Sequence, residues 1–276
     1  MTKNFLPLFL LIFLVIIWGS SFSTIKIILT AVPPLWIMFS RIALGSTVLL
    51  LWFLLKGRAI PLSKEFWVWS FIIGFLGFTL PFSVIAWGQQ YIPSSLTAIL
   101  MGINPILTLI LSYFLIKDEE ITSSKILGII FGFLGLILLI SLNELKTINI
   151  NSRFLIGQFA VLLGTSSYAL ATVLAKKISH IPSVDRAIGS LICASIMGLF
   201  IALVFEPLPN LLLLDTKIIL LLLFLGILPT GIATVVWFKI VDLKGPIFLS
   251  MVIKILFLCL RIINIFILLI IIKIIC

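Results

Sequence analysis

Charged residues are scarce in this sequence, and their scarcity excludes a water-soluble protein. Only 10% of the 276 residues are charged, whereas 62% are hydrophobic, and the mean hydropathy is +1.39. A soluble domain carries about a quarter of its residues as Asp, Glu, Lys or Arg. At about 20 apolar residues per transmembrane helix, the chain has room for roughly nine or ten spans. The composition therefore predicts an all-α polytopic membrane protein that is surrounded by a lipid bilayer.

Residues that build metal sites and catalytic centres are also few. The chain has one histidine, His180, and three cysteines, Cys193, Cys259 and Cys276, which share no motif spacing. This pattern excludes a disulfide framework and a Cys/His metal cage. The sequence also lacks a Walker motif, a glycine-rich phosphate loop and a nucleophile constellation. We therefore expect no enzymatic activity, no catalytic residue, no metal and no cofactor.

Acidic residues number only nine. We place all of them in connections or at helix ends: Glu65, Asp118, Glu119, Glu120, Glu144, Asp185, Glu206, Asp215 and Asp242. Proton relays inside membranes use intramembrane Asp, Glu or His side chains. The sequence therefore predicts that no carboxylate is buried, and it favours facilitated diffusion or exchange over proton coupling.

Hydrophobic runs bounded by charge, proline and polar clusters predict nine clear spans. The first five lie near 5–28, 34–55, 66–88, 93–116 and 125–142. A linker at 143–153 is rich in Asn and charge, and four more spans come after it, near 154–175, 184–205, 216–238 and 245–272.

Basic residues stand singly or in pairs between these runs, although the net charge is +10. Such residues act as topology signals, and the excess lies on the cytoplasmic side. With a cytoplasmic amino terminus, the outer connections hold Lys146, Arg153 and Lys217, and the inner ones hold Lys3, Lys56, Arg58, Lys64, Lys117, Lys125, Lys176, Lys177, Lys239 and Lys244. We therefore expect a multi-pass protein of the inner or plasma membrane with this orientation and with no nucleic-acid partner.

The two halves of the chain repeat a pattern of residues in the same order. The repeated elements are Ser20-Ser21-Phe22 with Ser166-Ser167-Tyr168, Arg41 with Arg186, Leu76-Gly77 with Leu225-Gly226, Pro81 with Pro229, and Trp87 with Trp237. A unit of five spans is odd in number, so a second copy enters the membrane from the opposite side. The pattern predicts inverted repeats at 1–142 and 154–276, the geometry that underlies alternating access in transporters.

Several motifs together resemble those of the EamA family of the drug/metabolite transporter superfamily. They are the pattern W-G-S-S-F-x-x-x-K from Trp18, the Arg41 start of the second span, the segment 93–98, the pair Asn104-Pro105 and the acidic turn after it. The resemblance covers about residues 8–252. It implies a ten-helix fold with both termini in the cytoplasm, which exports or exchanges small metabolites, often amino acids, through a central cavity. A secondary transporter of this kind is the expected function, and a non-transporting or degenerate membrane protein is the alternative.

Polar, aromatic and proline residues inside the spans are the candidates for the cavity wall. Pockets combine apolar walls with a few polar groups, and proline breaks inside membranes tend to lie beside protein or water-filled cavities. The candidates are Trp18, Ser20, Ser21, Arg41, Pro81, Trp87, Gln89, Asn104, Pro105, Ser166, Ser167, Tyr168, Pro229 and Trp237. Most have a structural alternative: helix packing for the serines, simple kinking for the prolines, interface anchoring for the aromatic residues, and a structural or gating role for Arg41.

Three glycines at a spacing typical of close helix contact lie on the fifth predicted span. They are Gly128, Gly132 and Gly135. Small residues allow helices in membranes to approach closely. We expect this face to pack within the monomer, with a homodimer contact as the alternative.

The repeat pattern fails after about residue 252. Ile253-Lys254 stands where the first unit has Asn104-Pro105, and the residues beyond it include no glycine, proline or acid. This composition is typical of an A/T-rich reading frame translated out of register. We therefore expect a frameshifted or decayed tail, with the ninth span altered and the tenth missing or degenerate.

Overall fold

The computed structural model describes residues 5–116, 122–123, 126–127, 129–130, 152–210 and 214–251. All regular structure in this part is helical. The first half contains α1 (Phe5–Ile28), α2 (Pro34–Leu55), α3 (Lys64–Gly74), η2 (Phe75–Thr79), α4 (Leu80–Gly88), α5 (Ser94–Met101) and α6 (Asn104–Leu115). The second half contains α9 (Ser152–Lys177), α10 (Ser183–Phe205), α11 (Thr216–Leu225), η4 (Gly226–Ile232) and α12 (Ala233–Ser250).

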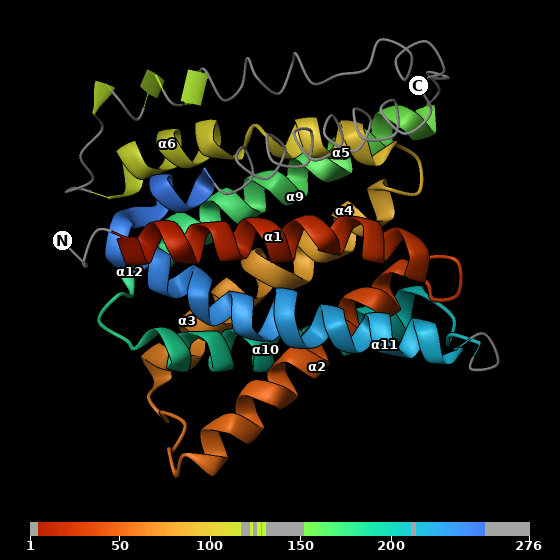
Figure 1. Ribbon diagram of the computed structural model, residues 1–276, viewed down its shortest axis with the longest axis horizontal. Helices are drawn as coiled ribbons and strands as arrows, with labels where there is room; N and C mark the ends of the chain where they lie inside the picture. The colour runs from red at the N-terminus through yellow and green to blue at the C-terminus, as the bar shows by residue number, and fades with distance from the viewer. Residues whose placement is uncertain are drawn as a thin grey trace, which may run out of the picture.

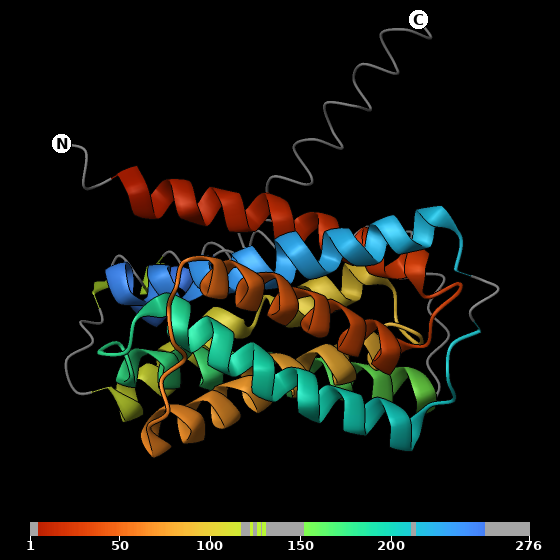
Figure 2. The same ribbon diagram turned by 90° about the horizontal axis from the view of Figure 1, so that it is seen from below.

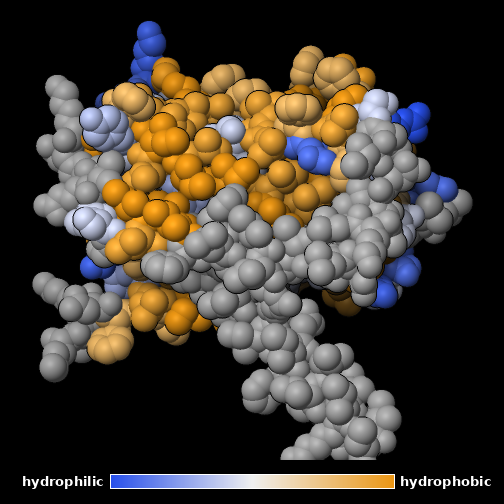
Figure 3. Space-filling model, turned by 90° about the horizontal axis from the view of Figure 1, so that it is seen from above, coloured by the Kyte–Doolittle hydropathy of each residue, from blue (hydrophilic) through white to orange (hydrophobic). Residues whose placement is uncertain are grey.

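Six helical segments in the described part are long and apolar enough to cross a membrane. They are Phe5–Ile28, Pro34–Leu55, Lys64–Gly88, Ser152–Lys177, Ser183–Phe205 and Thr216–Ser250, and a shorter apolar helix covers Ile99–Leu115. Hydrophobic side chains dominate the visible face, and hydrophilic ones gather mostly toward its two ends (Figure 3). The expectation of an all-helical, multi-pass membrane protein is therefore confirmed, while the count of nine spans stays a prediction.

The helices of the two halves intermingle in one bundle. Figures 1 and 2 show the long helices lying side by side, and α1 and α9 run in opposite directions along the bundle (Figure 1). Helices of the first half pack mainly against those of the second, as α2 does against α10 and α4 against α9. The α4–α9 contact needs glycine, because a Cβ on Gly88 would lie 2.7 Å from the carbonyl oxygen of Gly157.

Two short π-helices interrupt spans at corresponding places in the two halves. In the first half, the N–H of Leu80 donates to the carbonyl of Phe75, five residues earlier. In that register the next carbonyl, that of Leu76, faces Pro81, which has no N–H to donate. The hydroxyl of Ser167 on α9 donates to it instead, at 2.6 Å. A helix of the second half thus supplies the hydrogen bond that a proline of the first half removes.

The second π-helix, η4, contains a proline, and a hydroxyl of the same helix donates to a carbonyl near it. Pro229 lies inside η4 and has no N–H to donate, and the carbonyl of Leu225 lies at the start of this π-helix. The hydroxyl of Thr230 donates to that carbonyl at 2.8 Å. The carbonyl of Pro229 itself accepts a hydrogen bond from the indole Nε1 of Trp18 on α1, at 3.0 Å. Both proline breaks are therefore stabilised by side-chain hydrogen bonds.

A further break falls inside α12, where the sequence predicts the start of a new span. Gly245 has φ 83° and ψ 171°, outside the helical region. Glycine tolerates positive φ, and Pro246 disfavours a helical conformation for the residue before it. The linker up to residue 151, the glycines Gly128, Gly132 and Gly135, and the tail from residue 252 lie outside the described residues.

Candidate functional site

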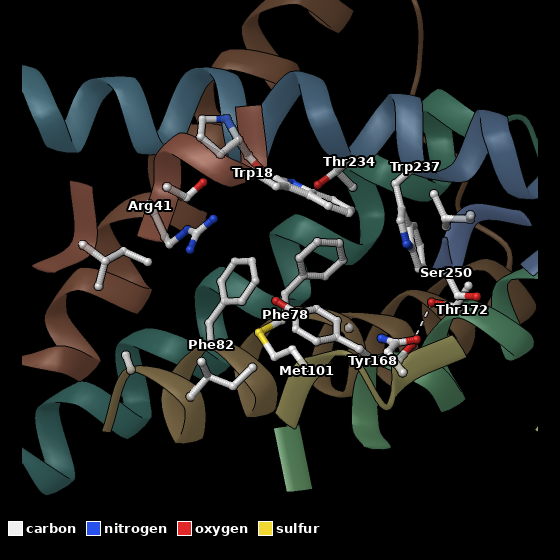
Figure 4. A pocket seen from close by; sticks show the side chains of 18 of the residues that line it. Trp18, Arg41, Phe78, Phe82, Met101, Tyr168, Thr172, Thr234, Trp237 and Ser250 are labelled. Carbon is white, nitrogen blue, oxygen red and sulfur yellow. Dashed lines mark hydrogen bonds between the residues drawn. The ribbon is translucent and has the colours of Figure 1, made fainter. Parts of the chain in front are cut away.

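A cavity lies between the two halves of the bundle. Its volume is about 120 Å³, several times the roughly 10–15 Å³ that one water molecule requires. Figure 4 shows side chains from both halves directed into this space, among them Trp18, Arg41, Tyr168 and Trp237. The wall consists of Trp18, Ser21, Ile25, Arg41, Gly77, Phe78, Phe82, Ile85, Ala86, Gln89, Met101, Asn104, Tyr168, Thr172, Pro229, Thr234, Trp237, Leu249 and Ser250.

The structure brings many of the sequence candidates together on this wall. Those that line the cavity are Trp18, Ser21, Arg41, Gln89, Asn104, Tyr168, Pro229 and Trp237. They come from α1, α2, the end of α4, α6, α9, η4 and α12, so helices far apart in the sequence converge here. The repeated motifs in the sequence are the signal that pointed to most of them.

The serine candidates separate into different environments. Ser20 and Ser166 are exposed, and each hydroxyl donates to a carbonyl of its own helix at 2.9 Å. Ser167 is buried but bonds the carbonyl of Leu76 in η2. Only Ser21 of these four lines the cavity, with its hydroxyl on the carbonyl of Ile17 at 3.1 Å.

The remaining candidates also lie off the wall. Pro81 and Pro105 are buried within the bundle, near the starts of α4 and α6. Trp87 is 36% exposed and packs edge-to-face on Tyr91, with ring centroids 4.9 Å apart. These positions fit the structural alternatives: helix breaking for the prolines and anchoring for the tryptophan.

Aromatic rings form much of the wall. Phe78 of η2 packs edge-to-face against Phe82 and Trp237, at centroid distances of 5.9 and 6.2 Å. Phe82 packs in turn against Tyr168 at 6.0 Å. Sequence reasoning missed Phe78 and Phe82, because phenylalanine occurs 23 times in this chain and nothing marks these two. Their positions on either side of Pro81 are the one signal that could have identified them.

Arg41 is the charged group of this wall. It is 6% exposed, and its Nε donates to the hydroxyl of Thr230 at 3.0 Å. Its guanidinium carbon lies 3.9 Å from the centroid of the Phe82 ring, a cation–π geometry. Among the described residues, no carboxylate forms an ion pair with Arg41. The cavity therefore carries a positive charge that the described part of the chain does not neutralise.

Two amides add polar groups to the wall. The Nε2 of Gln89 is buried and has no hydrogen-bond partner within the described part of the chain. The side-chain oxygen of Asn104 accepts from the hydroxyl of Thr108 at 2.9 Å. Buried polar groups are usually paired by protein or water. An unpaired donor at a cavity wall is therefore available to a bound molecule.

The ion pairs in the described part of the chain lie outside the cavity wall, and one of them corrects an expectation from the sequence. Asp185, in the first turn of α10, is only 7% exposed and pairs with Arg58 at 2.9 Å. Asp242 lies inside α12 and pairs with Arg186. The expectation that no carboxylate is buried is therefore wrong for Asp185. It failed because a position near a helix end in the sequence does not decide how other helices cover it.

The chain resembles known transporters. Residues 5–141 match the model of the EamA-like transporter family, which confirms the predicted resemblance over that range. The uncharacterized transporter YoaV of Bacillus subtilis (strain 168) is 27% identical over 232 residues, which are 82% of this chain and 76% of that protein. An uncharacterized transporter of Buchnera aphidicola subsp. Schlechtendalia chinensis is 30% identical over 183 residues, 64% of this chain and 57% of that protein. The names of these relatives indicate a transporter and not an enzyme.

A solved crystal structure shares the fold. It superposes with a TM-score of 0.74 at 18% sequence identity and covers 94% of this chain and 88% of that one. At this identity the likeness concerns the fold alone.

Proposed function

Because residues 5–141 belong to the EamA-like transporter family, we propose that this chain is a secondary transporter that exports or exchanges small metabolites, such as amino acids, by alternating access. The observation that carries the proposal is the cavity, because α1 and α2 of the first half and α9 and α12 of the second all contribute to its wall. A site between two halves can open to either side of a membrane as one half moves against the other.

Two features of the fold support the inverted repeat within this proposal, with units at 1–142 and 154–276. The helices that begin the two units, α1 and α9, run in opposite directions (Figure 1). Each half also has a π-helix at a proline: η2 ends two residues before Pro81, and η4 contains Pro229. Such interruptions frequently occur at functional sites. Paired irregularities at corresponding places are what duplication of one unit predicts.

The proposal places the protein in the inner or plasma membrane with a cytoplasmic amino terminus. A cysteine at Asn149, in a background whose three cysteines are replaced by serine, tests the orientation. We expect an impermeant thiol reagent to label this position in intact cells. Labelling only after permeabilisation would contradict the inverted arrangement. The homodimer contact through Gly128, Gly132 and Gly135 remains a separate proposal, to be tested by crosslinking.

Transport itself is tested by filling the cavity. Ser21→Leu adds apolar volume at the wall, whereas Ser20→Leu, one position away, adds the same volume on an exposed face of α1. We expect proteoliposomes with Ser21→Leu to lose uptake of labelled metabolites and those with Ser20→Leu to retain it. Equal uptake by both variants would show that the cavity is not the transport site. No uptake by the parent chain from a broad metabolite panel would favour the degenerate alternative.

A further inference from the structure

The cavity joins a buried cation to an aromatic wall, and this combination selects a class of substrate. We propose that the cavity takes an amphipathic organic monoanion, whose carboxylate binds the guanidinium of Arg41 and whose apolar body packs on Phe78, Tyr168 and Trp237. This inference rests on the proposed transport function and names the substrate class of the same site.

Arg41 has hydrogen-bond donors that the described part of the chain leaves unused. Within that part, only its Nε donates a hydrogen bond, to the neutral hydroxyl of Thr230. A guanidinium has five N–H donors and stays charged in proteins. A buried charge without a counter-ion is costly, and intramembrane charges generally face cavities or pair with other groups. The terminal nitrogens of Arg41 are therefore positioned to bind a group that the described part of the chain does not supply.

The hydrogen bond to Thr230 also fixes where Arg41 can point. Thr230 is held by its own bond to the carbonyl of Leu225, at the start of η4. Phe82 covers the guanidinium at 3.9 Å from its ring centroid. Nε donates to Thr230, and Phe82 covers one face of the guanidinium, so the two terminal nitrogens are the donors that remain. They form a fork that matches a carboxylate through two parallel hydrogen bonds. A halide offers one acceptor atom and not two, and the second charge of a phosphate dianion would cost more to bury in an apolar cavity.

The aromatic side chains of the wall indicate which apolar group the substrate carries besides its carboxylate. Phe78, Phe82, Tyr168 and Trp237 form a connected set of rings with centroids 5.9 to 6.2 Å apart. Trp237 is only 6% exposed, so its ring turns to the cavity and not to the outside. Rings in such arrangements favour an aromatic or branched apolar partner. The cavity thus has an anion-binding element and an apolar surface.

The described wall offers no negative group for a substrate cation. Neither Asp nor Glu is among the residues that line the cavity. The ammonium of an amine could contact amides, hydroxyls and ring faces there, but no carboxylate, and it would be repelled by the like charge of Arg41. We therefore expect a carboxylic acid to bind better than the matched amine.

The experiment measures binding to the purified full chain in detergent, so that it does not depend on transport. The probes are 3-phenylpropionate, 3-phenylpropan-1-ol and 3-phenylpropylamine, which differ only in the terminal group, and the readout is thermal stabilisation over a concentration series. We expect the carboxylate to bind about tenfold or more tightly than the alcohol, as expected for hydrogen bonds to charged groups. The amine should bind weakest. Equal affinity for carboxylate and alcohol would overturn the proposal.

Variants at Arg41 separate anion binding from folding. Arg41→Met keeps an unbranched side chain that reaches about as far as Nε, removes the guanidinium and its charge, and should fold, since it relieves a buried cation. We expect its affinity for 3-phenylpropionate to fall to that of 3-phenylpropan-1-ol, while its affinity for the alcohol stays the same. If Arg41→Met does not fold, Arg41→Lys keeps the charge but loses the fork, and its carboxylate preference should shrink. An unchanged preference in either folded variant would overturn the proposal.

Transport and binding fail in distinguishable ways. Carboxylate binding through Arg41 without any flux in proteoliposomes contradicts the transport function and leaves the anion site standing. Flux of other metabolites without a carboxylate preference contradicts the anion site and leaves transport standing.

Discussion

Arg41 and Arg186 hold corresponding positions in the repeat that we propose, and their environments differ. Arg186 is 1% exposed, donates to the carbonyl of Ala175 at 2.9 Å and pairs with Asp242. Arg41 is 6% exposed and has one neutral hydroxyl as a hydrogen-bond partner within the described part of the chain. Both lie against a phenylalanine ring, at 3.9 Å for Arg41 and 4.7 Å for Arg186. The two arginines thus differ in what they bind: Arg186 connects helices through Ala175 and Asp242, whereas Arg41 lines the cavity without a counter-ion in the described part of the chain.

The difference predicts opposite effects for the same substitution. Arg186→Met removes one member of a buried pair and leaves Asp242 without its cation. We expect a loss of about 3 kcal/mol, the lower end of the range for breaking a buried pair, because the Asp242 side chain is 23% exposed. Unfolding of the purified protein in a denaturant series measures the loss. Adding Asp242→Asn should restore part of the stability, and a double variant no better than the single one would contradict the pairing.

Arg41→Met should change stability in the other direction. Replacing even a buried ion pair by well-packed apolar side chains is often neutral or stabilising, by about 1–4 kcal/mol, and a buried cation without a counter-ion has less favourable interaction to lose. We expect a gain near the lower end, about 1 kcal/mol, because the hydrogen bond to Thr230 is lost at the same time. The same denaturant series tests this. A loss comparable to that of Arg186→Met would show that Arg41 holds the fold together and would remove the contrast between the two arginines.

Two hydroxyls that bond carbonyls near the proline breaks test whether Arg41 depends on its hydrogen bond to Thr230. Thr230→Val removes the hydroxyl that bonds both Leu225 and Arg41, and Ser167→Ala removes the one that bonds Leu76. An unsatisfied buried polar group costs about 1–3 kcal/mol, so both variants should lose stability. Only Thr230→Val should also reduce carboxylate binding, because Arg41 loses its anchor. Thr230→Ser is the control that keeps the hydroxyl and should behave as the parent chain.

The smallest effect concerns a carboxylate outside the spans. Glu206 accepts from the backbone N–H of Leu35 at 2.9 Å, at the start of α2. Burial raises the pKa of Glu206, and the backbone hydrogen bonds from Leu35 and Trp36 oppose this only in part. A raised pKa in the folded state means that stability is greatest when the group is protonated and falls as the pH rises through that value.

Thermal unfolding measured across mildly acidic to neutral pH tests this prediction. We expect Glu206→Gln, which keeps an acceptor for the N–H of Leu35 and cannot ionise, to flatten the decline of melting temperature with rising pH. Melting temperatures of the parent chain that increase over the same range would show that Glu206 is more stable ionised.

Much of the fold could be predicted from the sequence because its physical markers are local. The predicted spans 5–28 and 34–55 coincide with α1 and α2, since Pro33-Pro34 and Lys56 mark their limits. The eighth predicted span begins at Thr216 as α11 does, but the helix continues to Ser250 through a break at Gly245. The sequence predicts a connection at 239–244, where α12 is helical, and a new span from 245, where the break falls. The continuation was missed because helix packing decides whether the chain turns away.

The candidate site could be predicted only in part. Trp18, Arg41, Tyr168 and Pro229 stood out because repeats or charge marked them. Phe78 and Phe82 did not, because an apolar side chain on a cavity wall looks like any lipid-facing one in the sequence. The pairing of Arg58 with Asp185 joins residues 127 positions apart, and no local pattern identifies such a pair.

Access to Ser21 from both sides of the membrane is the measurement that tests alternating access most directly. Ser21→Cys, in a background with the three native cysteines replaced by serine, puts a thiol on the cavity wall. Impermeant maleimide is added to right-side-out and inside-out vesicles, with and without 3-phenylpropionate. We predict labelling from both sides, with the carboxylate protecting the thiol in each case. Labelling from one side alone under every condition would contradict a cavity that opens alternately to the two faces.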